Sequence, residues 1–270
     1  MFVHLTAMPG CCEELVERLC DEPAAATVSL VTGPFDFLVD CFAADQQDLA
    51  DLAVGTFAAM PGVARSESCM SVKTSRTGSD YRSGTLDPGQ ARVVGEGAVS
   101  AVPAGSPVDR TDRLLLQRLC LDGRTSWAEL GEFVGISART ARRRVDRLIA
   151  AGDVALRCDC SAEGRGPLHE VNLQVEVPAA ALDDAAAYFD RLRGCRLSAQ
   201  VFGNHNLEVT LWGRDLRVVN RYEAELQMAA PGARVVRREL GVRTVKRLGH
   251  VLDRTGRSVR VVPPLSWAVE

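Results

Sequence analysis

Hydrophobic and polar positions along this chain alternate as in strands or recur as in helices, and one order of elements occurs twice. The first copy predicts strands at 2–7, 27–32, 37–42 and 63–74 and helices at 13–21 and 45–60. The second copy predicts strands at 170–177, 197–202, 207–212 and 235–248 and helices at 180–192 and 215–228. This βαββαβ order is the split-βαβ, ferredoxin-like pattern.

The two copies align without a gap when the first is shifted by 170 residues (203 − 33 = 170). In this register turn and helix-end residues coincide: Gly33 with Gly203, Asp45 with Asp215, and Pro61-Gly62 with Pro231-Gly232. Such coincidences at one offset indicate an internal duplication.

Between the copies, residues 109–152 predict a three-helix unit that contains a helix-turn-helix. Ser126 and Glu129 form a Ser-x-x-Glu capping box, which marks a helix start. Gly135 suits the left-handed backbone of a sharp turn. Ser137 is a good N-cap for the next helix, and Gly152 is a good stop. Shifting this unit back by the same offset places it before Met1, so we expect a parent unit whose first helix-turn-helix is missing here.

The second helix of this motif carries the densest arginine cluster of the chain. On a helical projection its apolar residues share one face, and the arginines occupy the other. A recognition helix in the DNA major groove needs guanidinium groups for phosphates and guanine edges, whereas a merely solvated charged face is the alternative. The candidate DNA-binding residues are Ser137, Arg139, Thr140, Arg142, Arg143 and Arg147. Which of them reads a base stays open.

The predicted fold is therefore α+β, with two ferredoxin-like βαββαβ domains flanking a winged helix-turn-helix domain. Residues 154–160 are interpreted as a strand that forms a wing or a connector. The expected divisions are 1–75 (first βαββαβ domain), 76–108 (linker), 109–160 (helix-turn-helix domain), 165–250 (second βαββαβ domain) and 251–270 (C-terminal tail).

Composition restricts the partners. The net charge of the 270 residues is only −3, so any nucleic-acid contact must come from a local patch. Lys73 and Lys246 are the only lysines among 32 basic residues, which suggests a GC-rich bacterial genome. The nine cysteines are scattered, and neither Cys11-Cys12 nor Cys158-x-Cys160 has a second pair at zinc spacing. We expect free thiols, no metal and no cofactor. With neither a secretory signal nor an apolar run of the ~20 residues that span a bilayer, a cytoplasmic protein without membrane contact is expected.

The motifs resemble those of the Lrp/AsnC (feast/famine) transcription regulators of bacteria and archaea. The resemblance rests on Asp112-Arg113-x-Leu115, Asp122-Gly123-Arg124-x-Ser126-x-x-Glu129-Leu130, Val134-Gly135-Ile136-Ser137, Arg143-x-Val145-x-Arg147-Leu148, Val31-Thr32-Gly33-Pro34-Phe35-Asp36 and Met60-Pro61-Gly62-Val63. It implies binding of double-stranded operator DNA, assembly into homodimers or higher oligomers, and a small effector, typically an amino acid.

The resemblance also implies that the effector binds near the loop between the second and third strands of the βαββαβ domain. In the first copy this loop offers Gly33 and Asp36, and Asp36 either meets an amino group or simply caps the turn. In the second copy the corresponding residues are Gly203 and Asn206, so the acid is absent. His205 is interpreted as a turn residue. With one helix-turn-helix per chain, a second chain is needed to cover a two-fold operator.

Two other functions are alternatives to a DNA-binding regulator. Some siroheme decarboxylases resemble this fold and would use histidines and arginines around a carboxylated macrocycle. Here His4, His169, His205 and His250 are dispersed along the chain, and the surplus of arginines lies on the predicted recognition helix. No Gly-x-Ser-x-Gly, His-Glu-x-x-His or Gly-Lys-Ser/Thr signature is present, so we expect no enzyme. The third candidate is an effector-binding corepressor that does not read DNA.

Overall fold

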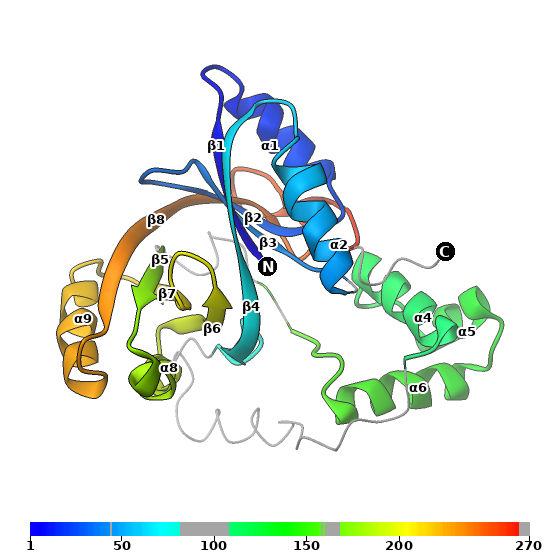
Figure 1. Ribbon diagram of the computed structural model, residues 1–270. Coiled ribbons are helices and arrows are strands. Elements are labelled where there is room, and N and C mark those ends of the chain that lie inside the picture. The colour runs from blue at the N-terminus through cyan, green and yellow to red at the C-terminus, as the bar shows by residue number, and fades with distance from the viewer. Residues whose placement is uncertain (44, 82–107, 158, 160–167, 265–270) are drawn as a thin grey trace.

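The computed structural model describes residues 1–43, 45–81, 108–157, 159 and 168–264 (Figure 1). Its first unit consists of β1 (Phe2–Ala7), α1 (Cys12–Asp21), β2 (Ala25–Val31), β3 (Phe37–Cys41), α2 (Gln46–Asp51), a π-helix (Leu52–Phe57) and β4 (Val63–Arg76). The helical unit follows, with α4 (Arg110–Leu121), α5 (Trp127–Val134) and α6 (Ala138–Ala151). None of the described helices is long and apolar enough to cross a lipid bilayer.

The second unit repeats the order of the first. It consists of β5 (His169–Glu176), a short 3-10 turn (Ala179–Ala181), α8 (Leu182–Arg191), β6 (Cys195–Phe202), β7 (Leu207–Gly213), α9 (Val218–Ala229) and β8 (Arg234–Arg247). A hairpin of β9 (His250–Leu252) and β10 (Ser258–Val261) follows, where the sequence suggested only a tail.

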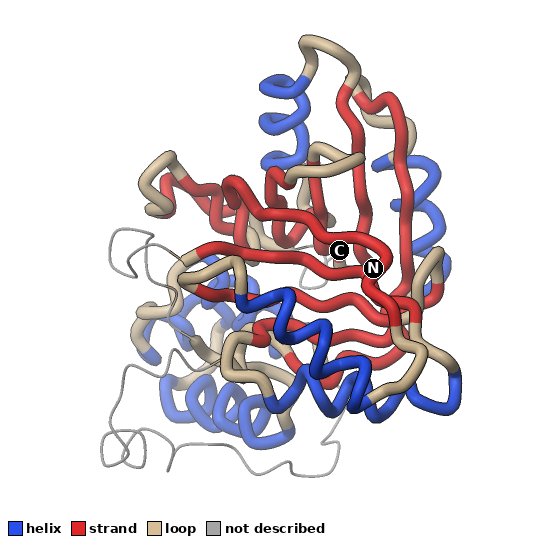
Figure 2. The backbone as a smooth tube through the Cα atoms, turned by 90° about the vertical axis from the view of Figure 1, so that its left-hand side faces the viewer, coloured by secondary structure: helices blue, strands red, loops and turns tan. Residues whose placement is uncertain are grey.

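The strands of both units join in one sheet, in the order β10-β9-β8-β2-β3-β1-β4-β6-β7-β5. Because β8 also pairs with β5, the eight strands of the two units close into a ring. The long strands β4 and β8 make this possible, since each pairs within its own unit through its first half and with the other unit through its second half. Figure 2 shows the strands gathered in the middle with helices around them.

The two pairings between the units match residue for residue. Arg76 pairs with Ser198 in one of them, and Lys246 pairs with Val28 in the other. Adding 170 to 76 gives 246 and adding 170 to 28 gives 198, so each pair is the image of the other. The pairs Thr74–Ala199 and Thr244–Ser29 obey the same rule. The two units are therefore related by an approximate two-fold axis.

Alternation along the strands separates two environments. On the outer face, apolar residues pack against the helices in two clusters, one per unit, which include Val3, Leu5 and Val39 in the first and Leu173 and Val209 in the second. The inner face of the ring holds a small apolar cluster beside buried polar side chains. The inner face therefore differs from an ordinary hydrophobic core, because it contains buried polar and charged side chains.

Several sequence expectations differ in detail. The helix expected over 45–60 changes from α-helix to π-helix at Leu52, where Val54, Gly55 and Thr56 are poor helix formers, and Ala58 N bonds Ala53 O across five residues. Residues 154–157 and 159 form no strand, so the expected wing is not found there; residues 158 and 160 lie outside the described chain. Most of the expected linker, 82–107, also lies outside it.

Candidate nucleic-acid interface

The helix-turn-helix forms as its local sequence predicts. Ser126 and Glu129 make a reciprocal capping box, with Ser126 N donating to Glu129 Oε2 at 2.9 Å. Gly135 ends α5 in the left-handed region, at φ 74°. Ser137 Oγ then accepts from Thr140 N at 3.2 Å and starts α6. These caps satisfy backbone groups on both sides of the turn, and they fix the angle at which α6 leaves it.

Gly131 allows the two helices to approach, a role that the sequence analysis does not predict. A Cβ atom at this position would lie 2.6 Å from Ile136 O and 3.0 Å from Ala138 N, which are both backbone atoms. Gly131 O also accepts from Ile136 N at 2.8 Å. The turn therefore packs directly against α5, and any side chain at 131 would push it away.

A small apolar core decides which face of α6 points outward. Leu115, Leu130, Ala141 and Val145 are fully buried together, and Ile136 packs against them. The three-helix unit stands to one side of the closed sheet, with α6 on its side farther from α1 and α2 (Figure 1). The face of α6 opposite this core is consequently open to a partner.

Three of the candidate arginines lie on that open face. Arg139, Arg142 and Arg143 are exposed. Among the described residues only Arg142 of these three forms an ion pair, a 3.4 Å contact with Asp146 one turn away. Exposed pairs of this kind contribute little, so Arg142 can leave it for a phosphate. The hydroxyl of Ser137 is occupied by the N-cap and lies 2.9 Å from that of Thr140. Both hydroxyls therefore sit at the first turn of α6, where helix amides attract anions.

Arg147 differs from the other candidates. Its guanidinium donates to Asp112, a fully buried acid in the first turn of α4. Arg144, which was not among the candidates, donates to the same carboxylate at 3.0 Å and to Asp109 at 2.7 Å. The bonds from the Asp112 amide and from Arg144 lower the pKa of Asp109. The contact of Arg147 with Asp112 holds α6 against α4, so Arg147 has a structural role that the projection onto a helical wheel did not reveal.

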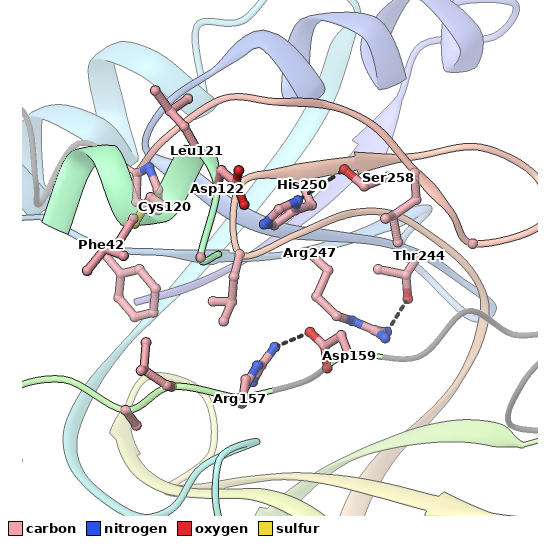
Figure 3. Close-up of a pocket in the computed structure, with 18 of the residues that line it drawn as sticks. Phe42, Cys120, Leu121, Asp122, Arg157, Asp159, Thr244, Arg247, His250 and Ser258 are labelled. Atoms are coloured by element: carbon pink, nitrogen blue, oxygen red, sulfur yellow. Dashed lines mark hydrogen bonds and ion pairs between the residues drawn. The ribbon is translucent and has the colours of Figure 1, made fainter. Parts of the chain in front are cut away.

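A cleft of about 1190 Å³ lies between the helical unit and the closed sheet (Figure 3). Its walls include Cys120 from α4, Arg157 after α6 and Arg247 from β8. Arg157 pairs with Asp159 at 2.8 Å, and Arg247 donates to Thr244 at 3.0 Å. Anything bound in this cleft would contact both the helical unit and the sheet.

Trp212 forms part of the wall of this cleft and lies under two guanidinium groups. Arg196 Cζ is 4.1 Å and Arg247 Cζ is 5.1 Å from its ring centre. Burial, together with the charges of Arg247 and Arg157, lowers the pKa of Arg196 to about 10. Glu170 accepts from Trp212 Nε1 at 2.9 Å and supplies negative charge nearby. The wall therefore combines stacked guanidinium groups and an indole ring with nearby carboxylates, so its charges are mixed.

The two candidate effector loops share one structural contact. Asp36 Oδ2 accepts from Ala7 N at 2.9 Å, and Asn206 Oδ1 accepts from Val177 N at 2.9 Å. These residues correspond under the offset of 170. The side chain at this position therefore fastens the loop to the end of the unit's first strand, which is the turn-capping role left open for Asp36. Gly33 has a φ of +113° that favours glycine.

The second loop contains a buried side chain as well as a close backbone contact. A Cβ at Gly203 would lie 2.6 Å from Cys69 Cβ, so this glycine permits close packing against β4. Gly203 and Asn206 border a shallow hollow of about 460 Å³. His205 lies in the turn, as the sequence suggests, but its side chain is only 4% exposed, and its Nε2 lies 2.6 Å from Glu208 Oε2. The offset of 170 pairs it with Phe35, which is also buried, and that correspondence was the available signal.

Comparison with known proteins identifies two segments. Residues 108–149 match the AsnC-type helix-turn-helix domain, and residues 1–79 match the Lrp/AsnC ligand binding domain. The chain thus contains two segments that are similar to domains of the Lrp/AsnC transcriptional regulators. A comparison with curated proteins finds no match.

Solved structures of such regulators resemble parts of the chain. The leucine response regulatory protein of Mycobacterium tuberculosis is 22% identical, with a TM-score of 0.46 over 52% of this chain and 96% of that one. AsnC of E. coli is 19% identical, with a TM-score of 0.42 over 51% and 93%. A transcriptional regulator of Neisseria meningitidis, solved in complex with L-Met, is 20% identical, with a TM-score of 0.41 over 57% and 96%.

Proposed function

We propose that this protein is a sequence-specific DNA-binding transcriptional regulator whose helix α6 enters the major groove of an operator. The observation that carries the proposal is the set of exposed arginines on the second helix of an AsnC-type helix-turn-helix. Arg139 and Arg143 are exposed and form no ion pair with the described residues, so their donors are available to phosphates or guanine edges. Arg142 is expected to join them after leaving Asp146.

We further propose that residues 165–250 are a second ligand-sensing domain, which pairs with the first inside one chain. The matched register of the two pairings between the units supports this, because it is the symmetry expected when two copies of one domain exchange equivalent strands. Each chain then carries one helix-turn-helix. A two-fold operator therefore requires two chains, and light scattering of the DNA complex should give two chains per duplex.

The test of DNA binding compares two double variants. Arg139→Ala/Arg143→Ala removes two charges from α6, and Arg217→Ala/Arg221→Ala removes two from exposed positions before and within α9. Binding of a fluorescent duplex from the promoter of its own gene is measured by anisotropy over a salt series.

If both α6 arginines hold phosphates, the log–log salt slope flattens by roughly two, at about 0.9 per contact. If either reads a base, discrimination between sites falls by about 1–3 kcal/mol for each such contact. The α9 double variant should bind like the wild type. An α6 double variant with wild-type affinity and slope would contradict the assignment.

A small effector, such as an amino acid, is proposed to bind at the loop formed by Gly33 to Asp36. The variant that tests this proposal must keep the hydrogen bond from Ala7 N to the side chain at position 36. Asp36→Ala would remove the bond to Ala7 as well as the charge. Asp36→Asn keeps an acceptor, as Asn206 does in the second unit, and removes only the charge. Thermal-shift screening with the common amino acids should identify an effector whose shift is lost in Asp36→Asn. If Asp36→Asn retains the full thermal shift, the Asp36 carboxylate is not the partner of the effector's amino group.

A further inference from the structure

The inner face of the closed sheet holds a buried cluster of polar side chains that DNA binding does not use. His4, Cys69, His205, Glu208 and Glu239 are all between 1% and 4% exposed. They come from β1, β4, the turn before β7, β7 and β8, so closure of the ring is what brings them together.

The cluster arises where the two units have diverged. At the offset of 170, His205 stands where the first unit has Phe35, and Glu208 stands where it has Leu38. Phe35 and Leu38 are buried apolar residues. Replacing such a pair by an imidazole and a carboxylate is costly unless the new groups gain partners. His205 and Glu208 are therefore expected to have polar or charged partners in the second unit that Phe35 and Leu38 do not need.

The distances within the cluster suit a metal ion. One ligand atom each from His4, Cys69 and Glu208 lies within 4.8 Å of the other two. Cys69 Sγ is also 4.0 Å from His205 Nε2. Ligand atoms around tetrahedral zinc are about 3.5 Å apart, given bonds of about 2.0–2.3 Å. A contraction of about 1 Å would bring the three side chains into a coordination shell.

Unsatisfied atoms in the cluster indicate a missing partner. Glu208 accepts from His205 through Oε2 at 2.6 Å, but its buried Oε1 has no hydrogen-bond partner in the described chain. Both carboxylate oxygens of Glu239 are also buried without a hydrogen bond. Burial, with the charge of Glu208, raises the pKa of the Cys69 thiol. A bound cation would compensate these carboxylates, and a thiol that coordinates a metal is deprotonated.

Outer partners for the ligands are already in place. His4 Nδ1 lies 3.5 Å from Glu239 Oε2, and His4 Nε2 lies 2.8 Å from Gln174 Nε2. If Nε2 binds the ion, the Nδ1–H faces the Glu239 carboxylate, which can orient the ring. His205 orients Glu208 in the same way. Metal sites commonly hold their ligands through such second contacts.

We propose that His4, Cys69 and Glu208 bind one divalent transition-metal ion inside the closed sheet. His205 would lie beside the fourth coordination position of this ion. A thiolate, an imidazole and a carboxylate are a ligand set that zinc accepts. His4 and Cys69 belong to the first unit and Glu208 to the second, so the ion links the two units. The ligands are far apart in the sequence, which explains why no zinc-like spacing is visible there.

The test uses the full chain, stripped with a chelator and titrated with Co²⁺, which reports a thiolate ligand by a sulfur-to-cobalt charge-transfer band. Wild-type protein should bind one Co²⁺ per chain with this band, and Zn²⁺ should displace it. Cys69→Ser should abolish the band, and Glu208→Gln should weaken the affinity at least tenfold. Cys41→Ser is the matched control, since Cys41 is an equally buried thiol in the outer core of the first unit.

Two results would overturn the proposal. One is a wild-type protein that takes up no Co²⁺ or Zn²⁺ under these conditions. The other is a charge-transfer band that survives Cys69→Ser or disappears in Cys41→Ser. If the cluster variants do not fold, X-ray absorption of the zinc-loaded wild type decides: one sulfur ligand supports the site, and none excludes it.

Discussion

Replacement of Asp112 should loosen the recognition helix while leaving the exposed Arg139, Arg142 and Arg143 in place. Asp112 is fully buried, and it receives bonds from Arg144 and Arg147 of α6 as well as from the Asp109 amide. Asp112→Ala therefore removes the polar link between α4 and α6, together with half of the capping box that starts α4.

The expected cost follows from these contacts. Hydrogen bonds to a charged group contribute about 1.5–3 kcal/mol each. Arg144 and Arg147 remain 29% and 31% exposed, so water replaces part of what they lose. We therefore reduce each bond to about 1 kcal/mol and add about 1 kcal/mol for the cap. The sum is about 3 kcal/mol, which corresponds to an increase of about 150-fold in the equilibrium constant for opening.

Amide hydrogen exchange measured on peptides from α6 is the suitable assay, because it isolates the helical unit from the closed sheet. Asp112→Ala should accelerate exchange in α6 by about two orders of magnitude and leave β5 and β7 unchanged. Asp146→Ala is the control, since its exposed 3.4 Å pair with Arg142 contributes less than about 0.5 kcal/mol. Exchange in Asp112→Ala within twofold of the wild type would refute the reasoning.

Three further changes test other parts of the structure. Gly131→Ala should destabilise the helical unit by about 1–3 kcal/mol, because its Cβ meets backbone at 2.6 Å, whereas Gly123→Ala meets only an oxygen at 3.8 Å and should be nearly neutral; hydrogen exchange distinguishes them. Asp36→Asn should leave the urea midpoint nearly unchanged, since the loop bond survives; a large loss would show that the charge itself holds the loop. Burial and the charge of Glu170 raise the pKa of Asp40 to about 6 from 3.8, so the native state binds this proton more tightly and stability falls as pH rises between these values. Asp40→Asn should therefore be stabilising by up to about 3 kcal/mol at pH 7, a gain that disappears near pH 4 in urea titrations; a gain independent of pH would contradict this.

Local features of the fold were predictable from the sequence. The capping box at Ser126, the left-handed Gly135 and the cap at Ser137 are short-range chemistry, and each forms as expected. Strand and helix positions in both units followed from hydrophobic periodicity, which depends on neighbours a few residues away.

Long-range contacts were not predictable in this way. Arg147 and Asp112 are brought together by the packing of α6 on α4, so a wheel projection of α6 alone placed Arg147 with the free arginines. His4 and His205 seemed dispersed, yet closure of the sheet places both at Glu208 and Cys69. Periodicity gives the face on which a side chain lies, but it does not give the partner that another segment supplies there.

Because β4 and β8 each pair with the other unit, the association of the two units does not depend on protein concentration. Two separate polypeptides that pair in this manner would dissociate on dilution, whereas here the partner is covalently attached and its effective concentration is fixed by the intervening chain. The paired state therefore does not depend on how many molecules a cell contains. Freed from the requirement of being identical, the two halves can also accumulate different side chains at equivalent positions, as Phe35 and His205 have done.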